Sequence, residues 1–280
     1  MKTLTSFFVI LIIAATFTAC SKSGDNPGKV TAATPLIKAM AFTTFSGRSI
    51  FNCTYDDKKR LTSTGFDNNV NPITYNLGGF QIVNTTEANK KKVIDFSLEN
   101  GRIKSSIYNV FINQVNQYLP VNSVFSYDAR GRLIKIQQTI TLDAAPPYPS
   151  RTIIYTFTWD DNDNLIGSSF YDPARPESKY EVAYSGFSAE NVNTLTGKNF
   201  GFDYFGTTSY TSQFNPGGDG SSGGILPFIY PGKILPSVWR LGNFTLNYTY
   251  HKNAQGYIDR IEETDTNDPN DFVYTDIAYQ

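Results

Sequence analysis

The stretch that decides the fold runs from Phe125 to Leu133 and reads Phe-Ser-Tyr-Asp-Ala-Arg-Gly-Arg-Leu. The residues before the turn are aromatic and alternate between apolar and polar, a pattern that indicates a half-buried strand. Asp128 begins the turn, where its carboxylate can accept a backbone N–H from two residues on, and Gly131 supplies the positive φ that closes the turn. Because the alternation resumes after Leu133, the stretch predicts a β-hairpin with a strongly specified register.

Degenerate copies of this unit recur at irregular spacing at residues 51–61, 96–103, 155–165 and 244–258. In the first copy Lys59 stands at the position of Gly131. In the third we expect Asn164 to replace the glycine, since Asn tolerates the left-handed region. In the last we expect His251 to stand at the aspartate position and the chain to turn through Asn253–Gly256. The copy at 96–103 contains Asn100-Gly101, a strong signal for a two-residue hairpin turn.

The composition agrees with a β protein, because 21 Phe and 18 Tyr occur among 280 residues and helix-forming runs are few. We therefore predict an all-β fold: a large antiparallel meander of hairpins that forms a strongly curved or barrel-like sheet. It would contain about ten to fourteen strands, and so large a sheet must curl or close. Phe272–Tyr279 is expected to be the closing strand.

The N-terminus predicts export. A lysine near the start is followed by the apolar run Phe7–Phe17 and by Thr-Ala-Cys, as in a signal peptide. A retained transmembrane helix is the alternative, which the short apolar run disfavours. We expect residues 1–19 to be a signal peptide, residues 20–35 an acylated cysteine with a flexible tether, and residues 36–280 a single all-β domain.

Three resemblances carry these expectations further. Phe17–Cys20 resembles the lipobox of bacterial lipoproteins, which implies cleavage before Cys20 and acylation of that cysteine. Tyr127-Asp128 and Gly131–Leu133 match the core of the tyrosine-aspartate (YD/RHS) repeat. The whole arrangement resembles a family of Gram-negative outer-membrane lipoproteins of unknown function with a porin-like, curved β-sheet fold. That resemblance implies an anchor in the outer membrane, on either its periplasmic or its surface-facing leaflet, and brings no activity.

The charge and the scarce Cys and His residues exclude several classes of site. With 24 basic and 25 acidic side chains there is no basic excess to neutralise phosphates, so we expect no nucleic-acid partner. If Cys20 is acylated, Cys53 has no partner for a disulfide within the chain, and we expect it to be a small buried residue. The single His251 cannot build a multi-histidine metal site, so no metal or cofactor is expected.

Three motifs partly match patterns of catalytic or metal-binding sites. Gly220–Gly224 fits a Gly-x-Ser-x-Gly nucleophile elbow, but it lies in a Gly-rich loop rather than between a strand and a helix. Asp160, Asn162 and Asn164 match the first positions of a calcium-binding loop, but the later positions of that loop are not matched. Asp and Asn are also ordinary turn residues, and we expect them to form a turn here. The acidic run Asp265–Asp271 is expected to be a solvated loop, with a weak surface cation site as the alternative.

The segment Gly224–Pro236 is apolar and contains three prolines, which argues against a central strand. We expect either a lid or plug over an open end of the sheet, or a loop that faces a ligand. Phe228 and Tyr230 in this segment, and Trp239 just after it, are the candidate ligand-binding residues. Trp239 also fits a buried core position.

These observations favour a cell-envelope lipoprotein that acts as a non-catalytic binding or structural module at the outer membrane, with a glycan or a peptide as ligand. The alternative is a carboxylate-dependent hydrolase of envelope or extracellular polymers, which would need two carboxylates facing each other at about 5–10 Å. A component of a larger surface complex is a third reading. The oligomeric state is left open.

The acylation hypothesis predicts that Cys20→Ser abolishes retention of the protein in the membrane fraction, because acyl chains contribute about 0.8 kcal/mol per buried methylene. Fractionation of cells that express either form measures this. A Cys20→Ser protein that still partitions with the membrane would show that the lipoprotein hypothesis is wrong.

Overall fold

The computed structural model describes residues 35–44, 47–68, 70–84, 92–112, 117–141, 150–195, 232–268 and 272–280. All of them belong to the compact unit Thr34–Gln280. Within these ranges the chain forms sixteen strands: β1 (Ile37–Thr44), β2 (Gly47–Tyr55), β3 (Leu61–Phe66), β4 (Asn71–Asn76), β5 (Gly79–Asn84), β6 (Lys92–Glu99), β7 (Arg102–Ile112), β8 (Gln117–Tyr127), β9 (Leu133–Ile140), β10 (Arg151–Trp159), β11 (Leu165–Asp172), β12 (Arg175–Ser185), β13 (Val238–Leu241), β14 (Phe244–Lys252), β15 (Ile258–Asp265) and β16 (Phe272–Tyr279).

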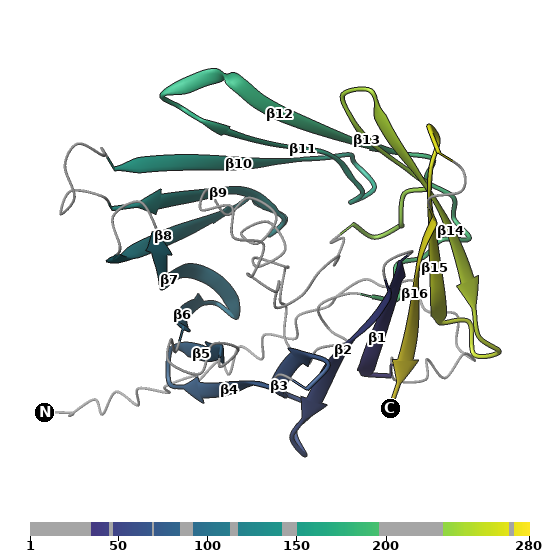
Figure 1. Cartoon of the computed structure of the whole chain (residues 1–280), viewed down its shortest axis with the longest axis horizontal. Coiled ribbons are helices and arrows are strands. Elements are labelled where there is room, and N and C mark those ends of the chain that lie inside the picture. The colour runs from purple at the N-terminus through teal and green to yellow at the C-terminus, as the bar shows by residue number, and fades with distance from the viewer. Residues whose placement is uncertain are drawn as a thin grey trace, which may run out of the picture. The chain divides into compact units, whose positions relative to one another are not determined.

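The strands form one closed antiparallel barrel in which each strand pairs with the next along the chain (Figure 1). The ring closes between β1 and β16, where Ile37 is opposite Tyr279 and the N–H of Gln280 donates to the carbonyl of Leu36 at 3.0 Å. The predicted all-β meander and the predicted closing strand are confirmed. The expected strand number was too low, because hairpins such as β4–β5, which turns at Asn76, lack the Tyr-Asp signature.

One face of each strand is buried. Phe51 on β2 is fully buried between Met40 of β1 and Phe66 of β3, and Phe80 on β5 stacks on Phe96 of β6 at 4.6 Å. The buried residues join into one apolar cluster that runs from β1 to β16. Side chains on the outer face of a closed barrel have no other strands opposite them to pack against, whereas inward side chains pack against one another. The buried face is therefore the barrel interior.

Cys53 lies in this interior on β2, as expected for a small buried residue. Burial raises the pKa of its thiol to about 12, so the thiol is protonated at neutral pH and unreactive.

The turn after Tyr127 is built by its aspartate, as the sequence predicts. One carboxylate oxygen of Asp128 accepts the backbone N–H of Arg132 at 2.8 Å, and the other accepts Nε of Arg132 at 2.7 Å. Gly131 has φ +80° and its N–H donates to the carbonyl of Asp128. Asp56, Asp160 and Asn253 begin turns of the same form, and the third residue after each has positive φ: Lys59, Asp163 and Gly256.

Two expectations about the turns are wrong. Asp163, with φ +65°, takes the left-handed position of its turn, whereas Asn164 takes the place of Arg132 and donates its side-chain amide to Asp160. His251 begins no turn, because β14 continues to Lys252 and Asn253 takes that role. The Asn100-Gly101 hairpin is confirmed, with φ +52° and +76° and Glu99 opposite Arg102.

Aromatic side chains at the strand ends link neighbouring hairpins. The Tyr127 hydroxyl at the end of β8 donates to the carbonyl of Ile103 at the start of β7, at 2.8 Å. These two strands are adjacent but are not joined by a turn at this end of the barrel, so the bond closes the ladder there. The same bond recurs as Tyr55 to Ile37, Tyr75 to Leu61, Trp159 to Leu133, Tyr250 to Pro236 and Tyr279 to Ile258.

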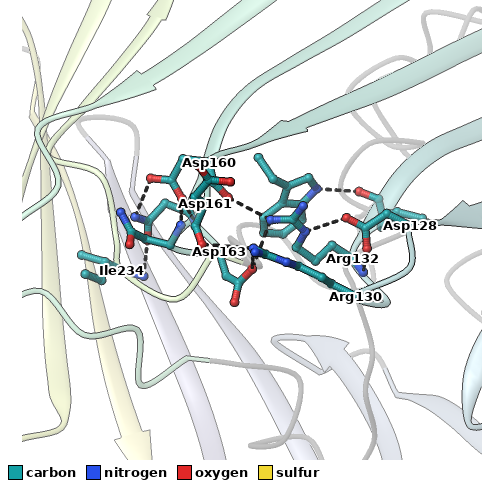
Figure 2. Close-up of polar contacts among 11 residues, drawn as sticks. Asp128, Arg130, Arg132, Asp160, Asp161, Asp163 and Ile234 are labelled. Carbon is teal, nitrogen blue, oxygen red and sulfur yellow. Dashed lines mark hydrogen bonds and ion pairs between the residues drawn. The ribbon is translucent and has the colours of Figure 1, made fainter.

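Arginines link one turn to the next. Arg102 lies over the ring of Tyr127 at 5.7 Å, and Arg132 lies over the ring of Trp159 at the same distance. Figure 2 shows Arg130 and Arg132 reaching from one turn to the next. Arg132 donates to the carbonyl of Asp160 at 2.8 Å, and both arginines contact a carboxylate oxygen of Asp163, at 3.1 and 3.2 Å.

This arrangement predicts different costs for two glycine substitutions. A Cβ at Gly131 would lie 2.0 Å from a guanidinium nitrogen of Arg102, whereas a Cβ at Gly256, which has φ +84°, would meet nothing within 4 Å. Gly256→Ala should destabilise the protein by about 1 kcal/mol through backbone strain alone. Gly131→Ala should cost about 1 kcal/mol more, because Arg102 must also leave Tyr127.

Urea unfolding of the lipid-free protein (residues 21–280) measures both costs. Equal losses for the two variants would show that the arginine contact contributes nothing.

Candidate functional site

Some of the candidate residues lie outside the described residues: Cys20, Phe228, Tyr230 and the loop 220–224. Of the predicted lid, residues 232–236 are described. They pair with residues 191–195 beside the turns, through a bridge between Val192 and Ile234 and a bond from the N–H of Leu235 to the carbonyl of Asn191 at 2.8 Å. Leu195 and Leu235 are buried in the core cluster. This part of the segment therefore packs against the turn end of the barrel.

The turn aspartates are held in their charged form. Burial alone would raise the pKa of Asp128, but hydrogen bonds from the backbone and side chain of Arg132 outweigh it and hold this pKa below its usual range. The pKa of Asp160 is lowered by its bonds from Asn164 in the same way. A catalytic acid needs a raised pKa, so these carboxylates act as turn caps. They stabilise the fold above their ordinary pKa, and that stabilisation is lost as the pH falls through the lowered pKa.

The calcium-like residues serve the same turn. Asp160 accepts the backbone N–H groups of Asn162 and Asn164 at 2.9 and 2.8 Å, and the side-chain oxygen of Asn164 accepts the N–H of Ile234. In the described ranges no group of three His, Cys, Asp or Glu residues is arranged to hold a metal ion. Asp265, which begins the acidic run, caps a bend by accepting the N–H of Asn267 at 2.8 Å.

Trp239 lies on the inner face of β13. It is paired with Tyr184 of β12 and Leu246 of β14, and its ring meets Phe244 edge-on at 5.8 Å. Tyr184 packs against the core cluster, which places this cross-strand row inside the barrel. We call the inner wall of β12–β15 around it the aromatic wall, made of Tyr184, Trp239, Phe244, Leu246, Tyr248, Tyr250, Ile261, Glu263 and Asp265.

The aromatic wall lies where the interior is most accessible: each strand from β1 to β11 carries at least one buried side chain, whereas no described residue of β12, β13 or β14 is buried. Phe51, Phe80 and Tyr155 are at most 1% exposed, whereas Phe244 is 40% exposed and the other members of the wall are half-buried. Large aromatic side chains that remain accessible on a concave surface are typical of ligand-binding sites. The wall is therefore the part of the described interior best suited to contact a ligand.

Glu263 is a member of the wall that sequence reasoning missed. It is opposite Tyr248, whose hydroxyl hydrogen-bonds to it. Burial first, and then the charge of Glu263, raises the pKa of Tyr248 well above its usual range, and the pKa of Tyr250 is raised for the same two reasons. The signal was present in the alternation of β15, which turns only one of the consecutive glutamates 262 and 263 inward.

The outer face of the same strands is charged. His251, Arg260 and Asp276 are in register across β14, β15 and β16. Arg260 contacts Asp276 at 2.7 Å, and His251 contacts Glu262 at 3.2 Å; all four side chains are between 34% and 48% exposed. Membrane-spanning barrels carry an apolar band outside, where each charge costs up to about 2–4 kcal/mol. The outer face of β14–β16 therefore suits water rather than lipid.

A search of the described residues for a helix able to cross a membrane finds none.

The fold is a porin-like, all-β antiparallel barrel. No family model and no curated protein match the chain. Among solved structures, it is similar to a porin-like protein from Bacteroides vulgatus, with a TM-score of 0.56 and 14% identity over 88% of this chain and 99% of that one. A porin-like protein from Bacteroides uniformis gives the same TM-score with 12% identity, over 87% and 98% of the two chains. Identities this low establish similarity of fold alone.

The charged outer face predicts that the lipid-free protein stays monodisperse in buffer without detergent, because its exterior needs no lipid. Size-exclusion chromatography with and without detergent measures this. Precipitation without detergent, reversed by adding it, would contradict this assignment of the two faces.

Proposed function

We propose that the protein is a lipoprotein of the bacterial cell envelope, anchored to the outer membrane through acylated Cys20. Its barrel is a non-catalytic binding module, and the aromatic wall around Trp239 is the surface that contacts the ligand. The ligand is a glycan or a peptide. The lipobox-like Phe17–Cys20 motif supports the anchor, and the turns built on Asp56, Asp128 and Asp160 support a kinship with tyrosine-aspartate repeats.

The observation that carries the binding role is the contrast within the barrel interior. The inner faces of β2–β10 are occupied by closely packed buried residues such as Phe51, Phe80 and Ile136. The aromatic wall instead keeps Trp239, Tyr248 and Phe244 partly accessible. Burying the part of these side chains that is still accessible is favourable by about 25 cal/mol per Å² of apolar surface, so a ligand that covers the wall is stabilised by it.

The hydrolase alternative gains no support from the described residues. The pKa shifts of Asp56, Asp128 and Asp160 are downward. The inward carboxylates Glu263 and Asp265 are neighbours on one face of β15, whereas a glycosidase pair flanks the scissile bond from two sides.

The binding role is tested with the lipid-free protein on glycan arrays and peptide-display libraries. We expect at least one ligand class to bind, and Trp239→Ala to weaken that binding by about ten-fold, as loss of a central aromatic contact does. Tyr274→Ala, which removes an aromatic ring from the outer face, is the matched control and should bind normally. Empty screens for both ligand classes would overturn the proposal.

A further inference from the structure

Glu263 places a carboxylate among the aromatic rings of the wall. It is opposite Tyr248 on β14, and the next inner pair along the two strands is Tyr250 with Ile261. The rings of Tyr248 and Tyr250 are nearly parallel, with centroids 6.4 Å apart. Tyr184 of β12 belongs to the neighbouring inner row, in register with Trp239 and Leu246. A charged oxygen and several ring faces therefore meet at one place on the inner wall.

The wall carries a negative charge that the outer face does not. At the paired inner positions of β13–β16 that the structure describes, the charged residues are Glu263, Asp265 and Lys252. Lys252 lies at the turn end, about 13 Å along the strand from Tyr248, and donates to the carbonyl of Glu190. On the outer face the acids Glu262 and Asp276 each contact a base. The inner wall is thus complementary to a cation.

The chemistry of the wall decides which cation. Hard metal ions such as Ca²⁺ require six to eight oxygen ligands, which ring faces cannot supply. Ring faces attract organic cations through the aromatic quadrupole, and a neighbouring carboxylate adds a charge–charge attraction. An anionic ligand would be repelled by the same carboxylates. An alkylammonium group, with an apolar surface and one positive charge, matches both features.

We propose that the aromatic wall binds a small organic cation through an alkylammonium group, with Glu263 supplying the charge and Tyr184, Tyr248 and Trp239 supplying the ring faces. This inference rests on the proposed binding role of the wall and defines its ligand chemically. The carboxylate of Glu263 keeps its hydrogen bond from Tyr248, and the ammonium group lies against the rings beside it.

The test uses choline as the probe and 3,3-dimethylbutan-1-ol, its neutral isostere, as the control ligand. The lipid-free protein carries Trp159→Tyr, the residue that makes the equivalent strand-end bond in the other hairpins, so that Trp239 is its only tryptophan and reports binding by its fluorescence. We expect a saturable change with choline and at least about ten-fold weaker binding of the alcohol, because only the charge differs.

Matched variants separate the roles of the residues. Glu263→Gln should weaken choline binding by about ten-fold, whereas Glu262→Gln, which removes the same charge from the outer face one residue away, should leave it unchanged. Tyr248→Phe should retain most of the binding and Tyr248→Leu should lose it, because the ring face is the contact. Urea unfolding of each variant establishes that it is folded. If Glu263→Gln does not fold, the comparison of Tyr248→Phe with Tyr248→Leu tests the proposal instead.

Equal binding of choline and the alcohol, or equal effects of the two glutamate substitutions, would overturn the cation proposal. So would binding of a lysine-rich peptide without binding of choline. If choline fails while a glycan or a neutral peptide changes the Trp239 signal, the cation proposal falls and the proposed function stands. If no ligand class binds, both fall.

Discussion

The hydrogen bond from a strand-end aromatic side chain to a carbonyl of the neighbouring hairpin is the interaction on which the rest of the barrel depends. A hairpin of two strands is marginally stable by itself in water, and a barrel of hairpins must hold each one to the next along edges that no turn connects. Tyr127, Trp159 and Tyr279 provide that link at one end of the ladder. Each also places its ring in the interior, so one side chain contributes both a directional bond and buried apolar area.

The division between the two faces follows from this arrangement. Because most large aromatic and aliphatic side chains lie inside, the strands carry many Thr, Asn and charged residues outside, as Asn52, Thr54 and His251 do, beside exposed aliphatic residues such as Ile107 and Val124. This is the reverse of the usual pattern in barrels that span membranes, in which the apolar residues face out and the interior is polar. The surfaces described in β14–β16 therefore do not have the chemistry of a membrane-spanning wall.

Much of the fold could be predicted from the sequence because its signals are local. The Asn100-Gly101 turn and the final strand each depend on a few consecutive residues, and both are confirmed. The hairpin at Leu133 is confirmed as well, although an irregularity in its register leaves Ile134 exposed while Leu133 and Ile136 are buried. The last turn at Asn253–Gly256 is confirmed too, but the alignment of His251 with the turn aspartate could not be corrected from the sequence, because only the pairing of β14 with β15 shows that β14 continues to Lys252. The same limit hid the candidate site. Trp239 stood out by its residue type, whereas Glu263 becomes notable only once its strand is laid beside Tyr248.

Because β1 and β16 pair like any other neighbouring strands, the closed ladder does not depend on which strand comes first in the sequence. Ile37 and Tyr279 occupy a pair like any other in the ring, and Gln280 is hydrogen-bonded to Leu36. The two ends of the barrel domain, at Leu36 and Gln280, can be joined by a short peptide, and the ring can then be opened at an exposed turn such as the one at Leu77. Such a circular permutant would keep every strand pair of the native ladder. The same fold is thus compatible with another strand as the first one in the sequence.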